Sequence, residues 1–177
     1  MIYIINFKTY QESTGINAIK LAEIIEDIRK EKNAEIYAVP QSIDIRDVAK
    51  ITKTLAQHID PILPGANTGS TLPNSVKDAG ATGTLINHAE RKLSFDKIEG
   101  CVNIAKQLGL KTICCAADIN EVMEISKFKP DYIAYEDPEL IGSGKSILKE
   151  KPEIITRFVE VLKELNSDAI PLCGAGG

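Results

Sequence analysis

The chain has no tryptophan, and its aromatic residues make up only 5% of the sequence. A core with so few rings must be aliphatic, with isoleucine as its main filler. The chain also has no excess of basic residues, because its net charge is −4 and its isoelectric point about 5.3. No dense stripe of lysine and arginine interrupts this balance. The composition therefore argues against a nucleic-acid partner.

Long apolar runs are also absent. No stretch approaches the roughly 18 consecutive apolar residues of a membrane-spanning helix. The first residues show no basic segment followed by an apolar one, which is the pattern of a secretory leader. The sequence therefore predicts a cytoplasmic protein without a membrane partner.

Cysteine is scarce, and its spacing is uninformative for metal binding. Cys101, Cys114, Cys115 and Cys173 form neither a C-x-x-C motif nor a zinc-ligand pattern. Cys114 and Cys115 are adjacent in a strand-like run, so their side chains point to opposite faces. We expect reduced, packed thiols, no metal site and no cofactor.

What the sequence does contain is a regular alternation of short apolar runs with helical patterns. Most of the runs are continuous, as expected for strands buried on both faces of a parallel arrangement. The predicted strands cover residues 2–6, 35–40, 55–59, 82–87, 111–116, 131–136 and 168–173.

Amphipathic helices are predicted between these strands. Apolar residues recur every three or four positions over 18–28, 98–108 and 154–165. Asp118 followed by Glu121 resembles a capping box at the start of a shorter helix. Weaker helical patterns lie around 43–54 and 73–79.

This order predicts an α/β fold that ends on a strand. It fits either an open doubly wound sheet or a (β/α) barrel. Seven strands are one fewer than a complete barrel needs. Since no linker or low-complexity tract interrupts the pattern, residues 1–177 are predicted to form a single domain.

In both architectures, functional residues gather at the carboxyl ends of the strands. These ends carry Asn6 and Lys8, Gln57 and His58, Asn87 and His88, and Glu136. A lysine, a histidine and a glutamate at three strand ends suit proton abstraction beside a carbonyl group. Glu136 would take the proton, His88 would polarise the oxygen, and Lys8 would stabilise the developing charge and an anionic substrate.

Two glycine-rich turns are candidate phosphate sites. Gly142, Ser143 and Gly144 can bring backbone N–H groups close to a phosphate, and the residues at 174–177, which include Gly174 and Ala175, form a second turn of this type. Residues 137–141, which lie between Glu136 and Gly142, have the composition of a lid-like loop.

Each of these residues also has a purely structural interpretation. A glutamate at a strand end can cap a helix, a lone histidine is often a hydrogen-bonded structural residue, and we expect this role for His58. A short G-x-G motif is a weak phosphate signal, and Lys8 could be a solvated surface residue. Only the joint placement of these residues favours a catalytic site.

Four ordered segments make the interpretation more specific. INFKTY (5–10), LINHAER (85–91), IAYEDPELIGSG (133–144) and LCGAGG (172–177) resemble triosephosphate isomerase in its short archaeal form. The segment at 56–73 resembles the protruding third loop of that family, with Thr68 at the tip that inserts into a partner subunit. The resemblance implies an incomplete TIM (β/α) barrel with about seven parallel strands.

The resemblance also implies roles for individual residues. Glu136 would abstract the α-proton, and His88 would be the neutral electrophile, held by the amides of the turn at Ala89 and Glu90. Lys8 and Asn6 would stabilise the substrate and the enediolate. Phosphate would be bound by backbone groups at Gly142, Ser143, Gly174 and Ala175. The ligand would be a triose phosphate, or a phosphate or sulfate ion.

The sequence departs from the family pattern at three places. Ala89 replaces a serine after the catalytic histidine, and Asp137 replaces a proline after the catalytic glutamate. An ionised Asp137 near the base would raise the pKa of Glu136 and disfavour an anionic substrate. Third, the family continues beyond the glycine turn of the seventh strand with a helix, an eighth strand, a second phosphate turn and a final helix.

Three functional hypotheses follow: a working isomerase, a barrel remnant with little or no turnover, and a non-catalytic α/β scaffold or weak phosphate-binding module. The absent part of the phosphate site favours the second hypothesis, a protein that is an isomerase by resemblance and has little or no activity. We also expect a homo-oligomer, a dimer or higher, because an unclosed barrel leaves apolar strand edges exposed. Edge-to-edge pairing and exchange of a βα element are both compatible with the sequence.

Overall fold

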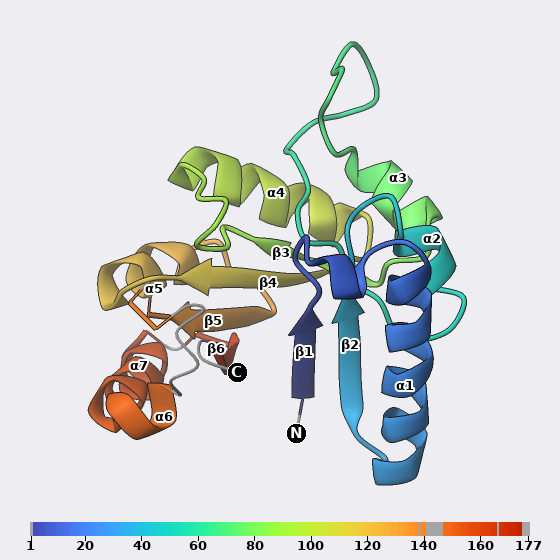
Figure 1. The fold of residues 1–177 in the computed structure, drawn as a ribbon. Helices are drawn as coiled ribbons and strands as arrows, with labels where there is room; N and C mark the ends of the chain where they lie inside the picture. The colour runs from blue at the N-terminus through green and yellow to red at the C-terminus, as the bar shows by residue number, and fades with distance from the viewer. Residues whose placement is uncertain (1, 138, 141–146, 166, 175–177) are drawn as a thin grey trace. The chain divides into compact units, whose positions relative to one another are not determined.

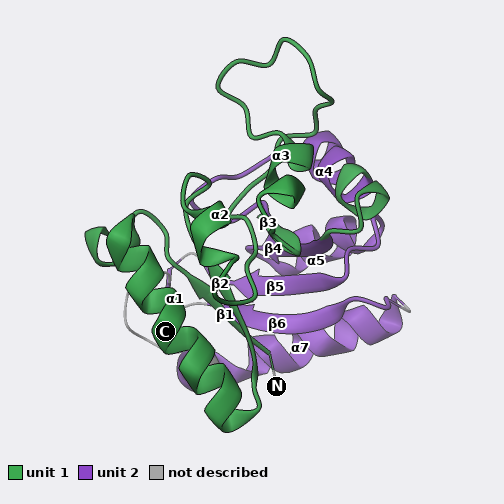
Figure 2. Ribbon diagram, turned by 90° about the vertical axis from the view of Figure 1, so that its right-hand side faces the viewer, with its two compact units in different colours: residues 1–85, 104–110 green, residues 86–103, 111–177 purple. Residues whose placement is uncertain are grey.

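The computed structural model describes residues 2–137, 139–140, 147–165 and 167–174. The chain divides into two compact units (Figure 2). Unit 1 comprises residues 1–85 and 104–110, and unit 2 comprises residues 86–103 and 111–177. The expectation of a single domain over 1–177 stays a prediction.

Strands and helices alternate along the described residues (Figure 1). In chain order they are β1 (Ile2–Asn6), η1 (Gln11–Ser13), α1 (Ile16–Lys32), β2 (Glu35–Val39), α2 (Ile45–Val48), α3 (Pro73–Asp78), β3 (Gly83–Ile86), α4 (Phe95–Gln107), β4 (Lys111–Ala116), α5 (Ile119–Ser126), β5 (Tyr132–Glu136), α6 (Ile147–Glu150), α7 (Pro152–Glu164) and β6 (Ile170–Gly174). None of the described helices is both long and apolar enough to cross a membrane.

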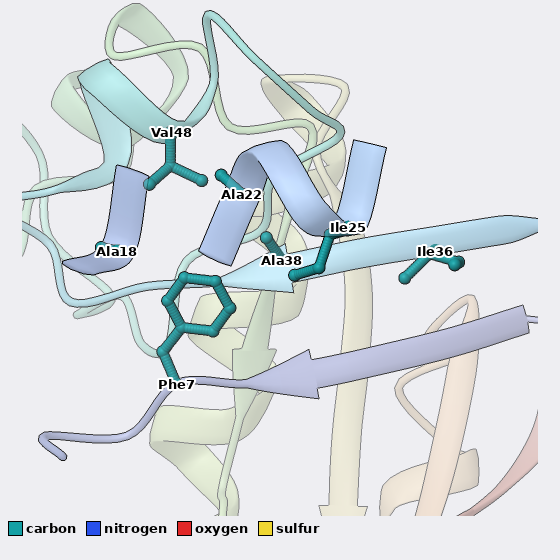
Figure 3. Close-up of a cluster of buried hydrophobic side chains, with 7 residues drawn as sticks. All are labelled: Phe7, Ala18, Ala22, Ile25, Ile36, Ala38 and Val48. Carbon is teal, nitrogen blue, oxygen red and sulfur yellow. The ribbon is translucent and has the colours of Figure 1, made fainter. Parts of the chain in front are cut away.

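In unit 1, β1 and β2 form a parallel pair in which Ile2 lies opposite Glu35 and Asn6 opposite Val39. Helix α1 runs alongside β2 (Figure 1) and turns its alanines and Ile25 inward. Figure 3 shows the resulting buried cluster, which consists of Phe7, Ala18, Ala22, Ile25, Ile36, Ala38 and Val48. As the composition predicts, this core is mainly aliphatic, with Phe7 as its one ring.

The predicted strand at 55–59 is wrong as a strand, and the described residues contain six strands rather than about seven. Residues 53–56 instead connect β2 to β3 through isolated parallel bridges, Ala38 with Thr54 and Ala56 with Thr84. The Ala56 N–H donates to the carbonyl of Gly83 at 2.9 Å. The pairing stops there because the chain enters a loop at Gln57, so the ladder is too short to count as a strand.

That loop, residues 57–72, extends away from the elements of unit 1 that flank it in the sequence (Figure 1). Asp60 closes its base, because its Oδ2 accepts the Thr71 N–H at 2.7 Å and its Oδ1 lies 3.0 Å from Nε2 of the buried His58. This contact supports the expected structural role of His58. The tip at 63–70, which includes Thr68, is exposed throughout.

In unit 2, β4, β5 and β6 pair in parallel and in that order, within a sheet whose full order is β3-β4-β5-β6. Ile113 lies opposite Tyr132, and Glu136 lies opposite Gly174. Helices α5 and α7 cover one face, where the Phe158 ring packs 5.6 Å from the Tyr135 ring. This register places Cys115, Ala134, Glu136 and Gly174 on the opposite face.

Candidate active site

The first part of the candidate site is a strained turn after β1 in unit 1. Lys8 has a φ of +48°, a conformation that side chains rarely adopt. The Lys8 N–H donates to Asn6 Oδ1 at 3.0 Å, and the Gln57 amide donates to the Lys8 carbonyl at 2.8 Å. Gln57 also donates to the Val39 carbonyl at 3.2 Å. The side chains of Asn6 and Gln57 thus hold the backbone of Lys8 in place.

Within unit 2, the loop after β3 depends on Asn87. This residue is 2% exposed and has a φ of +63°, which asparagine tolerates better than most residues. Its Nδ2 donates to the Cys115 carbonyl of β4, and its Oδ1 accepts the Leu93 N–H, both at 2.9 Å. The side chain therefore anchors the next few residues, including His88, to β4.

The orientation of His88 follows from the turn that it begins. The Glu90 N–H donates to His88 Nδ1 at 3.1 Å, and the Arg91 N–H donates to the His88 carbonyl. A neutral imidazole whose Nδ1 accepts a hydrogen bond carries its proton on Nε2. That Nε2 lies 3.7 Å from Glu136 Oε1, and both side chains are largely buried. Substitution of Ala89 for serine leaves the backbone donors of this turn intact.

Glu136 ends β5 with one unoccupied acceptor atom. Its Oε2 is buried and accepts no hydrogen bond from the residues that the structure describes. Buried carboxylate oxygens usually have partners, so an exception marks a functional candidate. Gly174 makes room for the group, because a Cβ there would lie 3.2 Å from Glu136 Cγ and 3.3 Å from Oε1. A larger residue at 174 would require the Glu136 side chain to shift by a few tenths of an ångström.

Cys115 contributes a third side chain to this face. Burial, followed by the neighbouring Glu136 carboxylate, raises the pKa of the Cys115 thiol well above its ordinary value. The thiol is therefore neutral at physiological pH and unsuited to act as a nucleophile. Its placement beside Glu136 follows from the strand alternation at 114–115 together with the parallel register of β4 and β5, which the alternation alone does not specify.

The second carboxylate that the sequence places beside the base, Asp137, is buried and paired. Lys151 Nζ lies 2.7 Å from Asp137 Oδ2, and this pairing is the main reason that the pKa of Asp137 is lowered. Asp137 is thus ionised near neutral pH, and its charge has a partner in Lys151.

The predicted site residues divide between the units. Asn6 and Lys8 lie in unit 1, whereas unit 2 brings together His88, Glu136 and Gly174. Gly142, Ser143 and Ala175 lie outside the described residues. Among the described side chains, no group of three or more histidine, cysteine, aspartate or glutamate residues could hold a metal ion.

Comparison with known proteins identifies the family to which the chain is similar. The family model of triosephosphate isomerase matches residues 1–176. The chain is 43% identical to the triosephosphate isomerase of Methanocaldococcus jannaschii, 46% to that of Methanobacterium bryantii and 45% to that of Saccharolobus solfataricus. Each alignment covers 99% of this chain and 78–81% of the relative. The chain therefore belongs to the triosephosphate isomerase family.

Proposed function

We propose that this chain binds triose phosphates and interconverts glyceraldehyde 3-phosphate and dihydroxyacetone phosphate. The observation that supports this most directly is the pair formed by Glu136 and His88. Glu136 has a buried carboxylate oxygen without a hydrogen-bond donor among the described residues, and Nε2 of a fixed imidazole lies 3.7 Å from its other oxygen. One group can take a proton while its neighbour donates one.

In the proposed reaction, Glu136 removes the proton from the carbon next to the carbonyl group. The His88 Nε2–H donates a hydrogen bond to the carbonyl oxygen, which gains negative charge as the enediolate forms. Glu136 then returns its proton to the former carbonyl carbon, while His88 gives its Nε2 proton to the former carbonyl oxygen and takes the proton of the neighbouring hydroxyl group, so that aldehyde and ketone exchange places without any redox change. The Lys8 ammonium would stabilise the enediolate and the phosphate. Backbone N–H groups near Gly142, Ser143, Gly174 and Ala175 would bind the phosphate.

A coupled-enzyme assay with glyceraldehyde 3-phosphate tests the proposal. Glu136→Gln removes the base without changing its shape, so we expect kcat to fall at least about 10²-fold. Glu153→Gln is the matched control, because Glu153 is an exposed glutamate in α7. Equal activity of Glu136→Gln and the unmodified chain would contradict the proposal. Binding of inorganic phosphate without turnover would favour the alternative, a non-catalytic phosphate-binding module.

We further propose that a polypeptide of these 177 residues is a slow isomerase. The relatives are longer, since this chain spans 78–81% of the three compared. If the remaining part supplies two hydrogen-bond donors to the phosphate, its absence costs roughly 3–6 kcal/mol, or about 10²–10⁴ in kcat/KM.

Fusion of the C-terminal segment of an archaeal relative after Gly177 should then raise kcat/KM by at least about 10²-fold. The fusion with Glu136→Gln serves as its control. A folded fusion with no gain would show that Asp137 or Ala89 limits the activity instead. We also propose that the chain is a homo-oligomer, a dimer or higher.

A further inference from the structure

Immediately after the candidate base, the chain forms a cluster of charged side chains that the proposed reaction does not use. We call Asp137, Glu139 and Lys151 the clamp. Lys151 Nζ lies 2.7 Å from Asp137 Oδ2 and 2.9 Å from Glu139 Oε2. Asp137 Oδ1 accepts the Glu139 N–H at 3.0 Å, and its carbonyl accepts the Leu140 N–H at 3.0 Å. The clamp thus joins the residues next to Glu136 to the residue that follows α6.

The clamp lies on the face of the sheet opposite to the candidate site. Successive residues of β5 alternate between faces, so Tyr135 points away from Glu136, and the charge of Asp137, the residue after β5, acts on Tyr135. Tyr135 packs against Phe158 of α7. Burial, followed by the nearby charge of Asp137, raises the pKa of Tyr135, whereas Lys151 acts in the opposite direction. The carboxylate is therefore enclosed between β5 and the helices that cover it, and its side chain is 8% exposed.

An enclosed carboxylate directly beside a catalytic base is costly without a cation. Ionised neighbours within a few ångströms disfavour each other's charge and repel anionic ligands. On the site face, Glu136 is bordered by His88 from the loop after β3, by Cys115 of β4 and by the backbone of Gly174 in β6. On the other face, Asp137 is bordered by Lys151, Glu139 and Tyr135. In this set, Lys151 is the group that carries the compensating positive charge.

We propose that Lys151 is a positioning residue for Glu136, which holds the backbone that follows the base and cancels the charge of Asp137. This inference rests on the proposed role of Glu136 as the base. In the pattern that the sequence resembles, a proline stands at position 137 and restricts the backbone covalently. Here an ion pair between the buried Asp137 carboxylate and the partly exposed Lys151 performs that restriction, and the lysine is required because the restricting residue is itself charged.

The test follows the ionisation of Glu136 directly, by the pH titration of its side-chain carboxyl carbon in a 13C-labelled chain, assigned with Glu136→Gln. Lys151→Met should move the Glu136 titration midpoint upward by about 0.5 or more, or add a second transition at the pKa of Asp137, because each carboxyl senses the other's ionisation. Lys151→Arg keeps the cation and should restore the original curve. Lys163→Met, at an exposed lysine of α7, is the matched control.

A second variant separates positioning from simple loss of stability. With Asp137→Asn already present there is no charge to cancel, so adding Lys151→Met should leave the Glu136 titration unchanged. An ion pair with only a structural role predicts something else: Lys151→Met would lower the urea midpoint and leave the titration of Glu136 as it was. That result, or an equal effect of Lys151→Met with and without Asp137→Asn, would overturn the inference.

The titration needs no turnover, so it is independent of the assay for the proposed function. Retained activity in Glu136→Gln would show that Glu136 is not the base. The coupling between Glu136 and Lys151 could still be measured in that case. Conversely, an unchanged titration beside a large loss of activity in Glu136→Gln would reject the inference and leave the proposed function standing.

Discussion

At the scale of single residues, four described residues other than glycine have positive φ angles, and two of them belong to the candidate site or directly precede one of its residues. Lys8 and Asn87 have positive φ angles, +48° and +63°. Such conformations persist where surrounding contacts enforce them, and they concentrate at functional sites. The enforcing contacts here are the hydrogen bonds of Asn6 and Gln57 around Lys8 and those of Asn87 to Cys115 and Leu93.

Asn87→Ala removes both buried hydrogen bonds and keeps the unfavourable backbone angle. We expect it to lower the free energy of unfolding by about 2–3 kcal/mol, measured by urea denaturation. Asn87→Gly removes the same bonds but relaxes the backbone, so its loss should be smaller by about 1 kcal/mol. If the two variants were equally stable, the positive φ would not be a source of strain.

Glu26 of α1 makes the stability of the chain depend on acid pH. Its carboxylate accepts two hydrogen bonds from Arg29 at 2.7 Å and one from Thr52 at 3.0 Å. These contacts, led by Arg29, lower the pKa of Glu26 from 4.5 to about 2. Because the folded state holds the lower pKa, the stabilisation is complete above about pH 4.5 and is lost as the pH falls toward 2.

We expect Glu26→Gln to lower the free energy of unfolding by about 1–2 kcal/mol more at pH 6 than at pH 2.5. Screening by solvent keeps this difference small. Urea unfolding at the two pH values measures this difference. Glu23→Gln, at an exposed glutamate of the same helix, should show no such pH dependence. A constant effect of Glu26→Gln across this range would contradict the assignment.

At the scale of elements, helix α5 begins at the position where the sequence predicts a helix cap. The Asp118 side chain accepts the Glu121 N–H at 2.8 Å, and Glu121 Oε2 accepts the Ala117 N–H at 2.8 Å. The first contact is the helix cap that the sequence predicts from Asp118 and Glu121, whereas the Glu121 carboxylate reaches the N–H of the residue before the cap rather than that of Asp118. Lys92 adds an ion pair to Glu121 at 2.5 Å, which ties the loop after β3 to the start of α5.

Asp118→Ala should therefore destabilise the chain by about 1 kcal/mol through loss of the helix cap. Asp118→Asn keeps an oxygen that can accept the Glu121 N–H and should retain most of the stability. Thermal and urea unfolding of both variants provide the measurement. A loss as large in the asparagine variant as in the alanine variant would assign the effect to charge rather than to capping.

Most elements could be predicted from the sequence because their signals are local. The apolar stripe of α1 and the capping residues of α5 require only neighbouring residues. The prediction of a strand at 55–59 was wrong because the apolar pattern there is that of a strand, whereas pairing depends on how far the segment stays beside β2 and β3. Similarly, Glu136 and His88 could be named from motifs, but the contact of Cys115 with Glu136 and the pairing of Asp137 with Lys151 join residues distant in sequence.

At the scale of the whole molecule, the outer strands of the two sheets are the exposed surfaces that bear on self-association. Among the described residues, β1 pairs only with β2, and β6 pairs only with β5. Neither strand carries a charged side chain. Tyr3 and Ile5 of β1 are 48% and 37% exposed, and Ile170 of β6 is 48% exposed. Edge strands of this kind are templates for pairing with another chain unless charges or coverage prevent it.

We therefore expect the 19.3 kDa chain to be a homo-oligomer, with an edge strand of one copy covered by another copy. Light scattering after size exclusion, at low micromolar concentration, should give a mass at least twice that of the chain. Ile5→Lys places a charge on the β1 edge and should shift the mass toward the monomer. Ile43→Lys is the matched control, because Ile43 is 84% exposed and lies outside both sheets. A folded monomer in the unmodified chain would contradict this expectation, and an equal shift in both variants would place the interface elsewhere than at β1.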